Sequence, residues 1–113
     1  MPLTNIESYE VIYSANAFFP RIGLLNGGKY IGQLIFHPDG AALPPDSMAG
    51  TQAQLHYHLE DFANAIDLLR NEKPLYLLYA GSGGGFENGI KTVPEGVGEG
   101  EKLPSYTVTA VPT

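Results

Sequence analysis

The sequence predicts an α+β domain in which a curved antiparallel sheet of about six strands packs on one helix. Several short segments alternate between apolar and polar residues, with the period of two that is typical of strands. Fourteen glycines and nine prolines supply the turns between these segments. One segment, residues 60–72, repeats its apolar residues with helical spacing instead. The expected order is therefore four strands, the helix and two further strands.

The strands expected before the helix are residues 6–15, 18–25, 29–37 and 52–58. Pro20 lacks an N–H group for a sheet ladder and so indicates an edge position or a bulge. Asn26-Gly27-Gly28 separates two apolar runs and predicts a tight hairpin, because asparagine and glycine tolerate positive φ. Residues 37–40 predict a turn. The residues that follow, up to 50, predict a loop that is long for a hairpin.

The predicted helix over residues 60–72 has one apolar stripe, formed by Leu59, Phe62, Ala65, Ile66 and Leu69. Glu60 and Asp61 lie in its first turn and Arg70 near its end, where each complements the helix dipole. Pro74 prevents the helix from continuing.

Two strands are expected after the helix. Residues 75–80 are almost entirely apolar and predict a central strand, and residues 86–93 predict a returning strand with a bulge at Asn88-Gly89. We therefore expect one domain over residues 1–93, followed by a Gly-rich acidic tail over residues 94–113. Within the tail, residues 105–111 alternate again, which fits either an edge strand or a loose tail.

Composition narrows the classes of function. The net charge of −6 disfavours nucleic acid as a partner, because an acidic protein repels phosphate backbones. The chain has no cysteine, which excludes disulfides and thiolate chemistry. Its first ten residues lack the basic and apolar regions of a signal peptide, and no apolar run reaches the length of a membrane helix. We expect a cytoplasmic protein without a membrane partner and without a cofactor.

His56, His58 and Glu60 form the sharpest candidate site. Residues at i, i+2 and i+4 of a strand project to one face, about 6–7 Å apart per step. Two imidazoles and a carboxylate in that arrangement could bind zinc or another first-row metal. The same face continues through Gln52 and Gln54, so it is equally the polar side of an amphipathic strand. His37 would be a third imidazole, although its neighbours indicate a turn.

No catalytic residue is assigned. The glycines of residues 81–85 lack the lysine and the following helix that a phosphate-binding loop requires. Seven tyrosines are present, and aromatic side chains on an exposed sheet can line a ligand groove or stack on bases. Among them, Tyr30, Tyr57 and Tyr76 are the candidate ligand-binding residues, although tyrosine is also an ordinary residue of sheet edges.

The Asn26-Gly27-Gly28 hairpin, the strand KYIGQLIF, the turn at residues 37–40 and the segment LHYHLEDFANAIDLL together form a pattern of four strands and one helix. This pattern resembles the single-stranded-DNA-binding regulators of the Whirly and positive-cofactor-four type. The resemblance implies a dimer that presents sheet surfaces to single strands. The Lys-Gly-Lys-Ala signature of the Whirly type is missing, as is a basic face. An oligonucleotide-binding-type barrel and a sheet rolled around the helix fit the same pattern.

We therefore expect a small, non-catalytic binding or interaction module. Single-stranded nucleic-acid binding is the first alternative, and a metal-dependent site at His56 and His58 is the second. Small β-rich domains often pair their exposed strand edges with a second copy, so we also expect a homodimer, and a different protein partner is the alternative.

Overall fold

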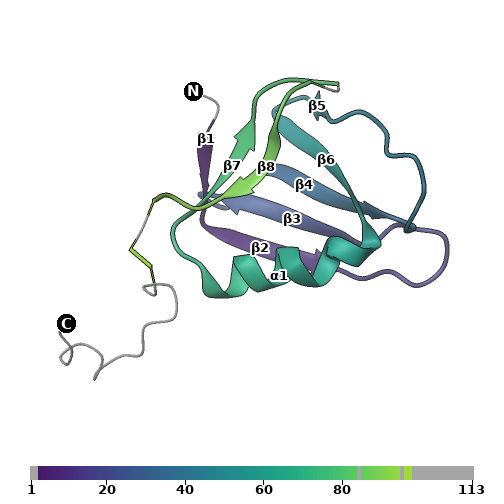
Figure 1. Ribbon diagram of the computed structural model, residues 1–113, viewed down its shortest axis with the longest axis horizontal. Coiled ribbons are helices and arrows are strands. Elements are labelled where there is room, and N and C mark those ends of the chain that lie inside the picture. The colour runs from purple at the N-terminus through teal and green to yellow at the C-terminus, as the bar shows by residue number, and fades with distance from the viewer. Residues whose placement is uncertain (1–2, 84, 95, 98–113) are drawn as a thin grey trace.

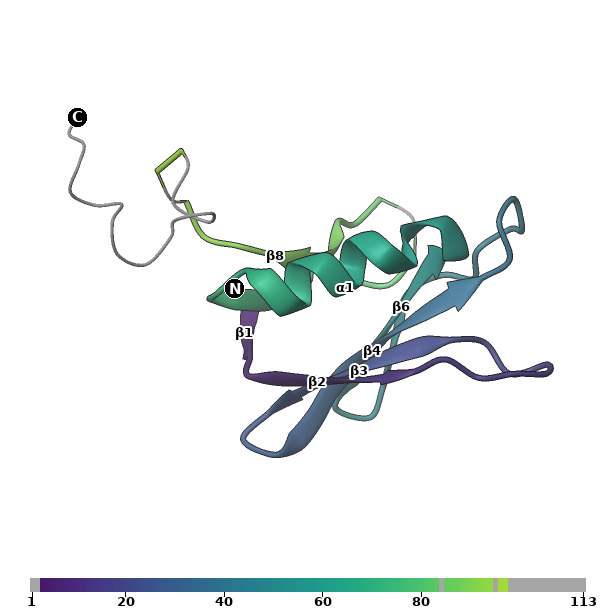
Figure 2. The same cartoon turned by 90° about the horizontal axis from the view of Figure 1, so that it is seen from below.

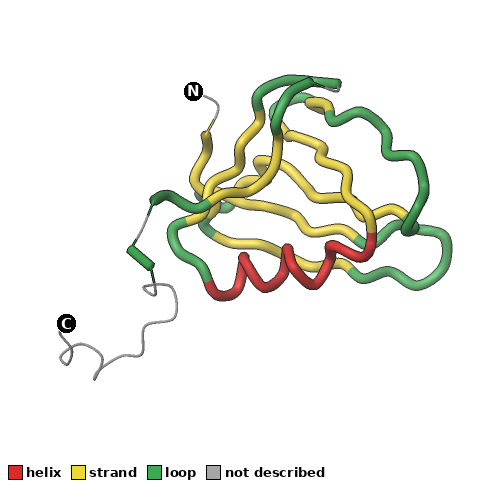
Figure 3. The backbone as a smooth tube through the Cα atoms, in the orientation of Figure 1, coloured by secondary structure: helices red, strands yellow, loops and turns green. Residues whose placement is uncertain are grey.

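The computed structural model describes residues 3–83, 85–94 and 96–97 of the chain. It contains eight strands, a short 3-10 turn and one α-helix (Figures 1 and 3). In chain order these are β1 (Leu3–Ile6), β2 (Ser8–Ile12), β3 (Arg21–Asn26), β4 (Lys29–His37), β5 (Ser47–Ala49), β6 (Gln52–His58), the 3-10 turn (Leu59–Asp61), α1 (Phe62–Asn71), β7 (Leu75–Tyr79) and β8 (Asn88–Lys91).

The strands form two sheets. The larger has five strands in the order β2-β3-β4-β6-β5, and the smaller has three in the order β1-β7-β8. Only Glu7 separates β1 from β2, so the chain passes from the small sheet into the large one at that residue. Figure 2 shows α1 and β8 on the same side of the large sheet. The helix and the small sheet therefore share one face of the large sheet, and its other face points outward.

The core lies between the large sheet and these two covering elements. Ile22, Leu24, Leu34 and Phe36 are fully buried on the inner face of β3 and β4. The remaining buried apolar residues come from β6, α1 and β7, namely Ala53, Leu55, Ala65, Leu69, Leu75 and Leu77. Alternate residues of each strand reach this core, which is the physical origin of the period of two in the sequence.

The turn between β3 and β4 follows the prediction from Asn26-Gly27-Gly28. Asn26 pairs with Lys29, and Gly27 and Gly28 between them have φ values of 61° and 78°. Two consecutive positive φ values give the turn the twist that a two-residue hairpin requires. Glycine also matters inside β4, where a Cβ atom on Gly32 would lie 2.9 Å from the Ala53 carbonyl oxygen.

The α+β class with one helix is confirmed, but the strands are arranged differently from the single antiparallel sheet that we expected. They belong to two sheets, and β6 runs parallel to β4. The connection between β4 and β6 is long enough to cross over the sheet end, as a parallel pair requires, and it adds the short strand β5. The strand expected over residues 6–15 corresponds to the shorter β2, and β1, which was not expected, precedes it.

The helix begins later than predicted. Residues 59–61 form a 3-10 turn, and α1 starts at Phe62. The Glu60 N–H donates to the Asp39 carboxylate at 2.7 Å instead of to the helix ladder. The strand considered for residues 105–111, and most of the tail, lie outside the described residues. Among the residues described, none of the helices has the length and apolar character needed to cross a membrane.

Candidate functional site

The three candidate tyrosines lie in different places. Tyr30 is 46 % exposed on the outer face of the large sheet, where its hydroxyl donates to the Glu10 carboxylate and its pKa is raised by that hydrogen bond. Tyr57 packs inward on Phe36, and burial raises its pKa to about 12. Tyr76 alternates with the buried Leu75 and Leu77 and so points out of the small sheet. The structure does not gather them into one site.

The predicted metal ligands are also placed apart. His56 and His58 project from the outer face of β6, as their spacing predicts, but Glu60 lies in the 3-10 turn. In the described part of the chain, no group of three or more histidine, cysteine, aspartate or glutamate side chains could hold a metal ion. Metal binding by His56, His58 and Glu60 therefore stays a prediction without a ligand cluster behind it.

Instead of a metal site, the parallel pairing of β4 and β6 creates a histidine pair. His37 ends β4 and is 7 % exposed, and its Nε2 lies 2.9 Å from Nδ1 of His56. One imidazole donates this hydrogen bond and the other accepts it, so the accepting ring is neutral. Burial lowers the pKa of both His37 and His56, and a nearby imidazole lowers it further, which is His58 for His37 and His37 for His56. Sequence reasoning placed His37 in a turn and missed this contact.

The histidine pair belongs to a hydrogen-bond network that joins the two sheets. The Asp46 carboxylate accepts from the His56 N–H at 2.9 Å and from the Asn88 side chain at 3.0 Å. His58 Nε2 donates to the Ala41 carbonyl at 2.7 Å, which fixes the loop before β5. Every polar group in this network that we describe has an internal partner. The network therefore accounts for much of the polar character that suggested a site on β6.

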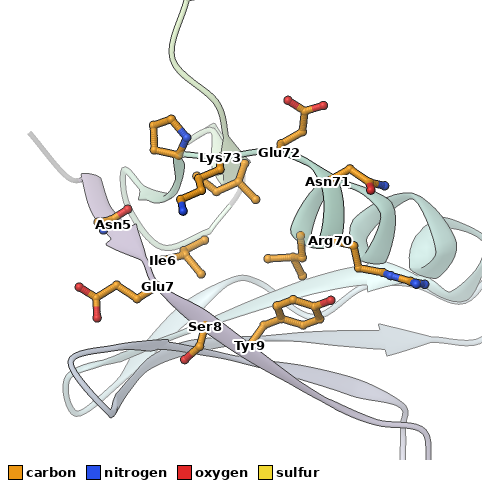
Figure 4. Close-up of a pocket in the computed structure, with 12 residues that line it drawn as sticks. Asn5, Ile6, Glu7, Ser8, Tyr9, Arg70, Asn71, Glu72 and Lys73 are labelled. Carbon is orange, nitrogen blue, oxygen red and sulfur yellow. The ribbon is translucent and has the colours of Figure 1, made fainter. Parts of the chain in front are cut away.

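A cavity lies elsewhere in the described part of the chain, between the β1–β2 corner and the C-terminal end of α1 (Figure 4). It has a volume of about 760 Å³, against about 190 Å³ and 200 Å³ for two depressions on and between the sheets. Residues 5–9 form one wall, and residues 69–75, which connect α1 to β7, form the other. The two walls thus come from segments that are sixty or more residues apart in the chain.

The cavity has an apolar floor and a polar rim. Ile6, Leu69 and Leu75 belong to the domain core or pack against it. The rim is polar and consists of Asn5, Glu7, Ser8, Tyr9, Arg70, Asn71, Glu72 and Lys73. Such a combination of apolar surface with a few polar groups is typical of ligand sites.

Exposed aromatic side chains gather on the loop between β2 and β3. Tyr13 is 70 % exposed, Phe18 is 71 % exposed and Phe19 is 44 % exposed. The Phe19 ring contacts the His37 ring, with centroids 4.6 Å apart, and Tyr13 contacts Phe62 at 5.4 Å. We call Tyr13, Phe18 and Phe19 the aromatic loop. Its composition was visible in the sequence, but the exposure of its rings was not.

Comparison with known proteins gives no relative from which a role could be transferred. The chain matches no protein-family model, no curated protein and no solved structure. The functional argument therefore depends on the geometry of the described residues.

Proposed function

We propose that the protein is a non-catalytic binding module, and that the cavity between the β1–β2 corner and the end of α1 is its ligand site. The volume of this cavity carries the proposal. At about 760 Å³ it falls within the range of roughly 300–1,000 Å³ that is usual for small-molecule pockets. Two other described depressions, at about 190 Å³ and 200 Å³, are too small to enclose a ligand of that size.

The chemistry of the wall supports binding over catalysis. The cavity contains no histidine, and the histidine pair that has perturbed pKa values lies on the outer face of the large sheet. Perturbed acid–base groups usually mark a catalytic site, and here they are engaged with one another at a different place. A cavity with an apolar floor and a polar rim is suited to holding an amphipathic ligand.

Protein-observed NMR with a collection of small amphipathic compounds tests the proposal on the full chain. We expect saturable shift changes at the amides of Tyr9, Leu69 and Leu75, because these residues line the cavity. The depression that contains Gly23 and Gln33 on the outer face serves as an internal control. The proposal is wrong if no compound shifts the cavity residues, or if the shifts centre on Gly23 and Gln33.

A protein interface at the aromatic loop is a second candidate function. Tyr13 and Phe18 expose more than two-thirds of their surface, and aromatic residues are enriched where proteins meet. The loop also follows β2, an edge strand of the large sheet, and the free edge of β2 can pair with a second copy. We propose a homodimer through this edge and loop.

Sedimentation equilibrium checks the dimer. We expect a mass of two chains at micromolar concentration, and of one chain for a Phe18→Ser variant. Phe86→Ser is the matched control, because Phe86 is also an exposed phenylalanine, at 52 %, but lies in the loop before β8. A mass of one chain for the unchanged protein would contradict the dimer.

A further inference from the structure

We infer that the cavity selects small amphipathic carboxylates, with the aliphatic chain on the apolar floor and the carboxylate at the ammonium group of Lys73. The inference rests on the proposed function of the cavity and adds the chemical class of the ligand. Three observations lead to it: the composition of the floor, the directions of the charged side chains on the rim, and the position of the end of α1.

The floor is suited to an aliphatic chain. Leu69 is 9 % exposed and Leu75 is 4 % exposed, and Ile6 packs against the same core from the opposite wall. These side chains are held by the folded domain and cannot turn away from the cavity. An aliphatic chain that covers them leaves water at about 0.8 kcal/mol per methylene, which corresponds to about a fourfold gain in affinity.

The charged groups on the rim do not act equally on the cavity. The Glu7 carboxylate accepts from the Gly27 N–H at 2.7 Å and is thus directed to the β3–β4 turn. Figure 4 shows Glu72 pointing away from β1 and β2, and the Arg70 side chain extending away from Asn5 and Ile6. Lys73, in contrast, points toward Asn5 and Ile6 across the cavity. The cavity therefore faces a cation, although acidic residues outnumber basic ones twelve to six in the chain.

The position of the end of α1 means that a carboxylate in the cavity requires the positive charge of Lys73. The Glu72 N–H closes the helix on the Leu68 carbonyl at 3.0 Å, so the negative end of the helix dipole lies at the cavity wall. A carboxylate beside that end is repelled unless a cation neutralises it. Lys73 follows Glu72, the residue that caps the helix, and supplies the positive charge. Removing the charge should therefore reverse the preference for an anion, and not merely weaken it.

Tyr9 adds a hydrogen-bonding group at the same wall. It is partly buried against the core, and Figure 4 shows its ring between Ser8 and the side of α1 that carries Arg70. A phenolic hydroxyl can donate to a carboxylate oxygen or to a bridging water. Lys73 and Tyr9 thus lie on opposite walls beside the floor, so the carboxylate of the ligand would lie between them and its aliphatic chain on the floor.

Calorimetric titration with four probes tests the inference: octanoate, decanoate, 1-octanol and octylammonium, each below its micelle concentration. We expect octanoate to bind more tightly than 1-octanol, and octylammonium to bind least. Decanoate should bind about fifteenfold more tightly than octanoate, because it has two more methylenes to bury. These comparisons separate the contribution of the floor from that of the charge.

Variants of the full chain identify the cation. In Lys73→Met we expect octanoate to bind about fivefold more weakly, which is the size of one exposed ion pair, and 1-octanol to become the better ligand. Lys73→Arg should keep the preference for octanoate. Lys91→Met makes the same charge change on β8, outside the cavity wall, and should bind like the unchanged protein.

The outcomes distinguish the two proposals. If 1-octanol binds as well as octanoate to the unchanged protein, the cavity is a ligand site but the selection of carboxylates is refuted. If octanoate binds equally to Lys73→Met and to the unchanged protein, the role of Lys73 is refuted. If none of the four probes binds, both the inference and the cavity as a site for small amphipathic ligands are overturned.

Discussion

Replacing Asn88 by alanine should weaken the connection between the two sheets. Asn88 begins β8, and its Oδ1 accepts from the Ala80 N–H at 2.7 Å. Its Nδ2 donates to the Gly81 carbonyl at 2.9 Å and to the Asp46 carboxylate at 3.0 Å. Asp46 also accepts from the His56 N–H, so one side chain ties the β7–β8 loop to β6 of the large sheet. Alanine removes all of these contacts together.

The magnitude follows from the kinds of bond. Each of the two shorter bonds to backbone groups contributes about 1 kcal/mol net, and the bond to the charged Asp46 contributes about 2 kcal/mol. A third backbone bond, from the Gly81 N–H to Oδ1 at 3.4 Å, is longer and adds less. Their sum is an upper value, because Asn88 is only partly buried and water can reach some of the groups that alanine would leave. We therefore expect Asn88→Ala to lower the free energy of unfolding by about 2–3 kcal/mol. In a domain of this size the melting temperature would fall by about 10 °C.

Urea unfolding followed by circular dichroism measures this change. Asn71→Ala is the matched control, since the exposed Asn71 side chain bonds to Asp67 in its own helix. Its loss should cost no more than about 0.5 kcal/mol. The structural reasoning is refuted if Asn88→Ala and Asn71→Ala have equal stability, or if Asn88→Ala changes the free energy of unfolding by less than about 0.5 kcal/mol.

Three further results are expected. Burial lowers the pKa of His37 and His56 in the folded protein. Below the ordinary histidine pKa of about 6.5, the unfolded chain therefore binds more protons than the folded protein does. Stability should thus be complete above that pH and fall as the pH drops below it; a urea midpoint that stays level or rises between about pH 7 and pH 5 would refute this. Gly32→Ala should destabilise the fold by about 1–3 kcal/mol in thermal unfolding, since its Cβ would meet a backbone carbonyl at 2.9 Å; unchanged stability would contradict that contact. Phe36→Ala should cost about 3–5 kcal/mol in urea unfolding because Phe36 is fully buried, whereas the exposed Phe18→Ala should cost less than about 0.5 kcal/mol; equal losses would contradict the burial pattern.

The alternation of apolar and polar residues identified most of the strands, because each strand buries one of its two faces. The expected strands over residues 29–37 and 52–58 coincide with β4 and β6. The direction of pairing could not be derived in the same way. A strand alternates identically in a parallel and an antiparallel pair, so nothing within β4 or β6 reveals that they run together. The strand β1 was missed because its four residues do not alternate between buried and exposed positions.

The candidate site was less accessible from the sequence. The outward direction of His56 and His58 was correct, but their partners come from β4 and from the loop before β5. No sequence pattern indicated the cavity, because its two walls are distant in the chain and its polar residues resemble ordinary solvent-exposed residues. A cavity is a property of how elements meet, and no single element carries it.

The position of the cavity follows from the connections of the fold. At Glu7 the chain leaves the small sheet for the large one, and at Pro74 it leaves the helix for the small sheet. The elements diverge at both points, and side chains that project from the diverging backbones fill only the floor between them. Leu69 and Leu75 serve both the core and the floor, so their substitution should alter stability and ligand affinity together. Lys73 is exposed and contributes nothing to the core, so its substitution should change affinity while leaving the stability of the domain intact.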